Sequence, residues 1–134
     1  MTSQPPIRLR PASITISGPD PIELARFYAK LLGVDVAVEE PAPEGLPPVA
    51  GWAQVKADPM TLNFEYEAQW QDPAWPAVHG RPTFTQHLDI WVDDVAAAVE
   101  WATACGARLA DSQFLGDRVK VMIDPVGHPF CLFR

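Results

Sequence analysis

The chain contains the same strand-and-helix pattern twice, offset by 74 residues. Each copy begins with an alternating strand pattern, continues with an aspartate that precedes a helical pattern, and ends at a glycine. These landmarks are Ser13, Asp20 and Gly33 in the first copy, and His87, Asp94 and Gly106 in the second. The aspartate follows the first residue of the strand pattern by seven positions in both copies. A repeat of this kind predicts a fold assembled from two similar modules.

Two helices follow from the apolar spacing. Over Pro21–Leu32, apolar residues recur every three or four positions and form one stripe, and Asp20 is a favourable N-cap. The second helix is predicted over Val95–Cys105. We expect its inner face to include Trp101, which would then lie in the core.

Each helix is followed by three further strand candidates, so both halves read β-α-β-β-β and the fold class is α+β. The candidates are Val34–Glu39, Ala50–Lys56 and Thr61–Tyr66 in the first half, and Ala107–Asp111, Val119–Ile123 and Pro129–Phe133 in the second. We expect a tail over residues 1–11 and a single domain over 12–133. Module one covers about 12–67, a linker about 68–85, and module two about 86–133.

Composition excludes several classes of function. The 134 residues carry a net charge of −7 with no run of Lys or Arg, which argues against binding to nucleic acid or to an anionic membrane. No apolar stretch is long enough to span a bilayer, and the first ten residues lack the apolar segment of a signal peptide. Two cysteines, Cys105 and Cys131, do not form a secreted-type disulfide framework. We therefore expect reduced thiols and a cytoplasmic location.

Three segments resemble the vicinal oxygen chelate superfamily, which includes glyoxalase I, bleomycin-resistance proteins and ring-cleaving dioxygenases. They are Ser13–Gly33, His87–Asp94 and Ile123–Leu132. The resemblance implies two βαβββ modules that form an open, curled mixed sheet around a cavity for a small molecule. It also implies a homodimer in which the partner chain can complete each cavity.

The resemblance assigns four positions that hold a metal in metal-dependent relatives: Ser13, Glu65, His87 and Cys131. Histidine and glutamate are good ligands for a divalent ion, but a neutral serine hydroxyl is a poor one. A cysteine thiolate is a soft ligand, so it suits zinc better than a harder ion that prefers oxygen ligands. We therefore favour no metal cofactor, and a divalent metal held by Glu65 and His87 remains the alternative.

Each of these residues also has a plainer interpretation. His87 can be a hydrogen-bonded structural histidine, and Glu65 can lie on the solvated face of a strand instead of lining a cavity. Cys131 resembles a small buried hydrophobe. A nucleophilic Cys131–His87 pair would require a lowered thiol pKa, for which the sequence offers no cause.

Tryptophan is abundant for so small a chain. Trp91 shares a strand face with His87, and Trp52 lies in a predicted middle strand. Trp70 and Trp75 lie in the linker, where they either pack on the body or cover a ligand. Flat rings hold bulky apolar or aromatic ligands well, so we count these four tryptophans with Ser13, Glu65, His87 and Cys131 as ligand-binding candidates.

Three functions fit these residues. The favoured one is binding of a bulky, partly apolar or aromatic small molecule without a catalytic metal, for sequestration or resistance. The second is a metal-dependent lyase, isomerase or dioxygenase, in which the ion chelates neighbouring substrate oxygens. The third is a metal-free acid/base enzyme that uses His87 and Glu65.

Overall fold

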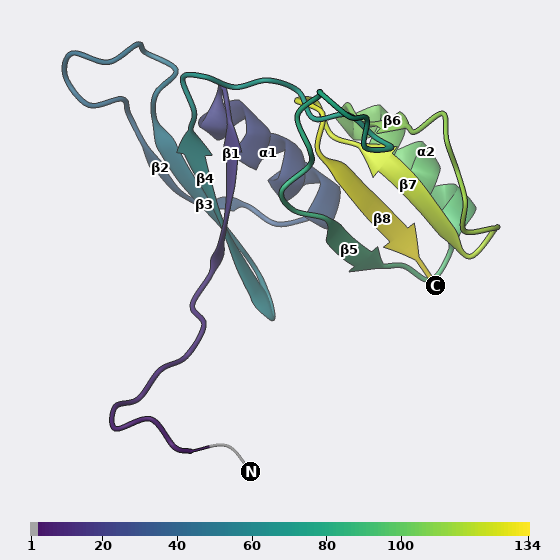
Figure 1. Ribbon diagram of the computed structural model, residues 1–134, viewed down its shortest axis with the longest axis horizontal. Helices are drawn as coiled ribbons and strands as arrows, with labels where there is room; N and C mark the ends of the chain where they lie inside the picture. Colours follow the sequence, from purple (N-terminus) through teal and green to yellow (C-terminus); the bar gives the residue numbers. More distant parts are fainter. Residues whose placement is uncertain (1–2) are drawn as a thin grey trace.

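The computed structural model describes residues 3–134, in which the two copies of the repeat form modules with the same element order (Figure 1). Module one contains β1 (Ile14–Gly18), α1 (Pro21–Leu32), β2 (Val36–Glu40), β3 (Trp52–Ala57) and β4 (Met60–Tyr66). Module two contains β5 (Leu88–Trp91), α2 (Val95–Cys105), β6 (Arg108–Leu109), β7 (Val119–Ile123) and β8 (Pro129–Phe133). The predicted α+β fold of two βαβββ modules is confirmed.

Both helices begin and end at the residues that the repeat predicts. The side chains of Asp20 and Asp94 each accept a backbone N–H from the first turn of the helix that follows. Gly33 and Gly106 end the helices with φ angles of 71° and 119°, a region that favours glycine. Within residues 3–134, neither helix combines the length and the apolar character needed to cross a membrane.

The modules form two separate four-stranded sheets with equivalent strand orders, β1-β4-β3-β2 and β5-β8-β7-β6. In each sheet the first strand pairs in parallel with the last, and the other neighbours are antiparallel. Strand β6 is shorter than predicted, and just beyond it the backbone N–H of Ala110 and the side chain of Gln113 both bond to Val121 of β7. The Gln113 amide group exchanges two hydrogen bonds, of 2.8 and 2.9 Å, with the backbone of Val121.

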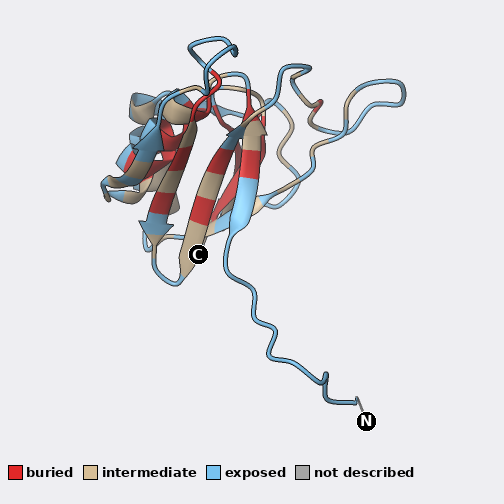
Figure 2. Ribbon diagram, turned by 90° about the vertical axis from the view of Figure 1, so that its left-hand side faces the viewer, coloured by how far each residue is buried: buried red, intermediate tan, exposed pale blue. Residues whose placement is uncertain are grey.

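Helix α1 lies between the two sheets (Figure 1). The Tyr28 ring stacks on Phe64 of β4, with 5.7 Å between the ring centroids, and lies edge-on to Phe130 of β8, with 6.1 Å between the centroids. Helix α1 therefore packs on both modules. Along β3 and β4 buried residues alternate with less buried ones, which indicates one covered face for the first sheet (Figure 2). In β7 and β8 the buried residues are consecutive, so the second sheet is covered on both faces there. The N-terminal tail extends away from this body and is exposed (Figure 2).

The expectation that Trp101 lies in the core is wrong, because its side chain is 48% exposed. Ala102 is the fully buried residue of α2, and Ala98 and Val99 pack beside it. These small side chains form the contact of α2 with the core. Trp101 instead lies at the border and donates its indole N–H to the carbonyl of Leu31 on α1, at 3.0 Å.

A buried carboxylate joins α1 to the turn between β7 and β8. Asp124 is 3% exposed, and its Oδ2 accepts the Tyr28 hydroxyl at 2.7 Å and contacts His128 Nδ1 at 2.6 Å. Its Oδ1 accepts the backbone N–H groups of Val126 and His128, both at 3.0 Å. Burial, followed by the charge of Asp124, raises the pKa of Tyr28, so the phenol keeps its proton and acts as the donor.

Replacing Tyr28 with Phe removes one of these donors and leaves the ring in place. Because the buried carboxylate loses a partner, we expect the free energy of unfolding to fall by about 1–3 kcal/mol. Urea unfolding followed by circular dichroism measures the change. Tyr66→Phe at the end of β4 is the matched control, with an expected loss below about 0.5 kcal/mol. Equal losses in the two variants would contradict the proposed tie.

Candidate functional site

The candidate residues lie on the faces of the two sheets that turn away from the helices. In β4, Leu62 and Phe64 are buried in the core, so the alternating residues Asn63 and Glu65 lie on the opposite face. In each module, we call the face of the sheet that turns away from the helices the open face of that module.

The open face of module one is polar. Ser13 Oγ accepts the Asn63 amide at 2.8 Å, and Asn63 Oδ1 accepts the Gln54 amide at 2.9 Å, which gives a ladder across neighbouring strands. Glu65 is exposed and lies opposite the half-buried Trp52 in the register of β3 and β4. Within one chain, then, Ser13 has a local partner and Glu65 faces solvent.

The open face of module two is mainly apolar. Cys131 forms a small second core with three aliphatic residues, and Trp75 from the linker packs against it. The aliphatic members are Ala110, Val121 and Ile123. This cluster is separate from the main core, so the linker covers part of the face that the helices do not reach.

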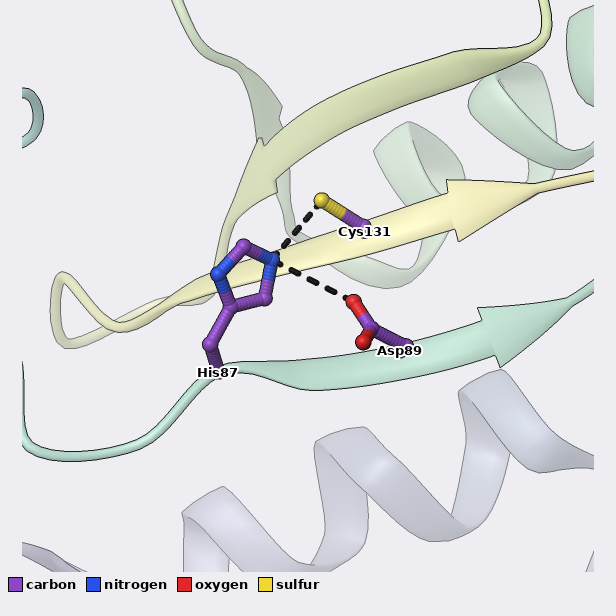
Figure 3. A group of neighbouring side chains, drawn as sticks. All are labelled: His87, Asp89 and Cys131. Carbon is purple, nitrogen blue, oxygen red and sulfur yellow. Dashed lines mark hydrogen bonds and ion pairs between the residues drawn. The ribbon is translucent and has the colours of Figure 1, made fainter.

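His87, Asp89 and Cys131 meet at the border of this apolar face (Figure 3). His87 Nε2 lies 2.7 Å from Cys131 Sγ and 3.4 Å from Asp89 Oδ1. The His87 side chain is 31% exposed, and its ring packs edge-on against Trp75 at 5.9 Å and against Phe84 at 6.5 Å. The neighbouring strands β5 and β8 bring these groups together, since Asp89 and Cys131 are direct partners in their register.

The protonation of Cys131 decides what this group can do. Burial, assisted by the negative charge of Asp89, raises the pKa of the Cys131 thiol to about 11. At neutral pH the thiol therefore keeps its proton and can donate it to the His87 ring. A nucleophilic pair would need the opposite shift, so the geometry brings the two residues together without activating the sulfur.

The same three residues can hold a divalent ion. Their nitrogen, oxygen and sulfur ligand atoms all lie within 4.8 Å of one another. A set with one thiolate suits zinc better than a hard ion such as Mn²⁺. Among the described residues, Ser13 and Glu65 do not belong to this group, because they lie on the other sheet. One chain alone therefore does not assemble the four positions that the resemblance assigned.

The structure separates the four tryptophan candidates. Trp75 packs on the open face of module two, and Trp91 is 66% exposed at the end of β5. Trp52 lies on module one, and Trp70 packs against His128 with ring centroids 4.8 Å apart. Both linker tryptophans thus contact the body of the domain, which is one of the two interpretations that the sequence left open.

Two functional features were absent from the sequence-based site. Asp89 joins His87 in the potential metal group, and strand alternation already placed it on the same face. His128 is 1% exposed, with its Nε2 atom buried and without a partner. No local pattern marks His128 as buried, because its cover comes from the distant linker.

Comparison with known proteins identifies the family. A profile of the glyoxalase-like domain matches residues 13–133. The chain belongs to this family. It is thereby a member of the vicinal oxygen chelate superfamily, as the sequence motifs predicted. No curated protein matches this glyoxalase-like chain.

Solved structures share the glyoxalase-like fold. A glyoxalase/bleomycin resistance protein/dioxygenase family enzyme from Burkholderia phytofirmans has 18% identity and a TM-score of 0.61, over 90% of this chain and 94% of that chain. The fosfomycin resistance protein FosX from Listeria monocytogenes, complexed with Mn(II) and sulfate, has 12% identity and a TM-score of 0.66, over 94% and 92%. TioX from Micromonospora has 18% identity and a TM-score of 0.59, over 93% and 98%.

The raised pKa of Cys131 predicts slow alkylation. Because the thiolate is the reactive form, iodoacetamide should modify Cys131 slowly at pH 8, and the rate should climb as the pH approaches about 11. Mass spectrometry of the Cys105→Ser variant isolates the Cys131 reaction. Cys131→Ser provides the control for reaction at Cys105. A half-maximal rate below pH 9 would contradict the assignment.

Proposed function

We propose that this glyoxalase-like protein binds a bulky, partly apolar or aromatic small molecule without a catalytic metal, as a sequestration or resistance protein does. One observation carries the proposal: the His87 ring nitrogen that a metal would need lies 2.7 Å from a thiol with a pKa near 11. The surrounding face is apolar and carries Trp75, which suits an aromatic ligand. Trp91 is exposed at the end of β5, on the strand face that also carries Asp89.

We propose further that the functional cavity forms in a homodimer, between module one of one protomer and module two of its partner. In a single chain the candidate residues lie on two separate sheets, with α1 between them. Within residues 3–134, the outer edges of β1 and β5 have no strand partner and are available to a second copy. Such a pairing would bring the Trp52–Glu65 surface over the His87–Cys131 surface.

The ligand of FosX is not transferred to this chain. The FosX structures contain Mn(II) with a phosphonic acid or sulfate, and an anion of that kind needs positive charge around it. In the proposed shared cavity, Glu65 of one open face and Asp89 of the other would both lie near the ligand. Their negative charges favour a neutral or cationic ligand.

The metal-dependent alternative rests on the compact group of His87, Asp89 and Cys131. In that case the ion would act as a Lewis acid for a lyase, isomerase or dioxygenase reaction. The acid/base alternative requires His87 and Glu65 to work together, and their separation on two sheets makes it depend on the same dimer. We place any of these functions in the cytoplasm, since both cysteines are free thiols.

Binding should survive removal of metal. We expect hydroxylated aromatic compounds of the polyketide type to quench tryptophan fluorescence in a saturable way, with equal affinity before and after dialysis against EDTA. Trp75→Phe should weaken the affinity about tenfold or more because the apolar face loses its largest ring. Trp101→Phe, on the outer border of α2, is the matched control.

Elemental analysis separates the alternatives in the same samples. A stoichiometric transition metal whose removal abolishes binding would reject the metal-free proposal and support the Lewis-acid enzyme. Absence of quenching by every compound of the panel would reject small-molecule sequestration.

Mixing two inactive variants tests the shared cavity. Trp52→Ala damages module one, and His87→Ala damages module two, so each homodimer should lose binding at both of its sites. After subunit exchange, a mixed dimer contains one cavity with neither substitution, and about a quarter of the wild-type binding capacity should return. A cavity within one chain would give no recovery, and a monomer in sedimentation experiments would also overturn the proposal.

A further inference from the structure

We propose that the domain has a second small-molecule site, under the linker and separate from the two open faces. It is a cavity of about 270 Å³ between the two ends of the linker and the turn that joins β7 to β8. The ligand would be a small phenol or amide that donates a hydrogen bond to His128 Nε2 and lies beside Trp70. The inference does not depend on the proposed function.

One of the residues that line the cavity is a buried histidine whose Nε2 lacks a hydrogen-bond partner within residues 3–134. His128 lines the cavity but is only 1% exposed, and its Nδ1 lies 2.6 Å from Asp124 Oδ2. Its Nε2 is buried and has no hydrogen-bond partner among the described residues. Most buried polar atoms in proteins are hydrogen-bonded, so this nitrogen marks a position where a partner is missing.

The surrounding network defines what that partner must be. Asp124 accepts hydrogen bonds from the Tyr28 hydroxyl and from two backbone N–H groups. The Asp124 carboxylate also accepts a hydrogen bond from His128 Nδ1. We therefore assign a proton to Nδ1 of the imidazole. In the neutral form of the ring, Nε2 then presents a lone pair. A hydroxyl or an N–H group of a ligand complements that form.

The wall beside His128 is a fixed aromatic ring. The Trp70 ring lies at 42° to the imidazole, with 4.8 Å between the centroids. Its indole N–H donates to Asp72 Oδ1 at 3.0 Å and to the carbonyl of Val126 at 3.2 Å, so the ring is held between the linker and the turn. A rigid apolar wall of this kind suits a flat ring.

The rest of the lining sets the size and charge of the ligand. Pro73 and Pro82 add apolar surface, Thr83 and Thr85 are polar, and Glu67 carries the one formal charge among the lining residues. The volume lies just below the usual range for small-molecule pockets, which fits a single ring with one substituent. Because the formal charge among the lining residues is the Glu67 carboxylate, the cavity disfavours anions.

Two probes, one with a hydroxyl donor and one with that hydrogen replaced by a methyl group, test this site on the unaltered chain. Phenol can donate a hydrogen bond to His128 Nε2, whereas anisole has nearly the same shape and cannot. In ¹⁵N-labelled protein, we expect phenol to shift the signals of the Trp70 indole, the Thr85 amide and the His128 ring in a saturable way. Anisole should bind at least about tenfold more weakly, because it leaves the buried nitrogen without a donor.

Variants then assign the effect to this cavity. Trp70→Leu should abolish the phenol shifts, and Trp101→Leu, at a tryptophan of α2 that does not line the cavity, should leave them unchanged. Equal affinity for phenol and anisole would overturn the proposal. So would the absence of saturation up to about 10 mM, which would leave water as the only occupant, or phenol shifts confined to His87 and Cys131, which would assign the probe to the open faces.

Discussion

The buried carboxylate of Asp124 holds the two modules in one arrangement. A carboxylate without partners is expensive to bury, so its position is stable only where donors surround it. The Tyr28 hydroxyl supplies one of them from module one, and the turn of module two supplies the others. This contact orients α1 so that its aromatic face packs on both sheets, which places the helix between them.

The position of α1 explains why the candidate residues are divided. Each sheet packs one face on the helices. The other face is open in module one and partly covered by the linker in module two. The polar ladder of Ser13, Asn63 and Gln54 therefore lies on one open face, and the apolar cluster around Cys131 lies on the other. Neither face alone combines polar recognition with aromatic contact, and we infer from this that two chains build the functional cavity.

Much of the fold and part of the site follow from local patterns. The helix caps at Asp20 and Asp94 and the alternation along β5 depend only on residues close by in the chain. They can therefore be predicted from the sequence. The exposure of Trp101 could not be predicted in this way. The apolar pattern of α2 does not show which of its residues lies at the edge of the core. Trp101 lies there and donates its indole N–H to the carbonyl of Leu31 on the neighbouring helix α1.

The order of residues alone settles the two βαβββ modules, their caps and the side of each strand on which a residue lies, because these depend on neighbours along the chain. Contacts across the fold settle the chemistry. His87 meets Cys131 over 44 residues, and Tyr28 meets Asp124 over 96. Only those contacts bury the Cys131 thiol and raise its pKa, and only the covering linker leaves His128 Nε2 enclosed. Burial and hydrogen-bond partners depend on position in space, and they give two histidines and a cysteine the properties on which the two proposed sites rest.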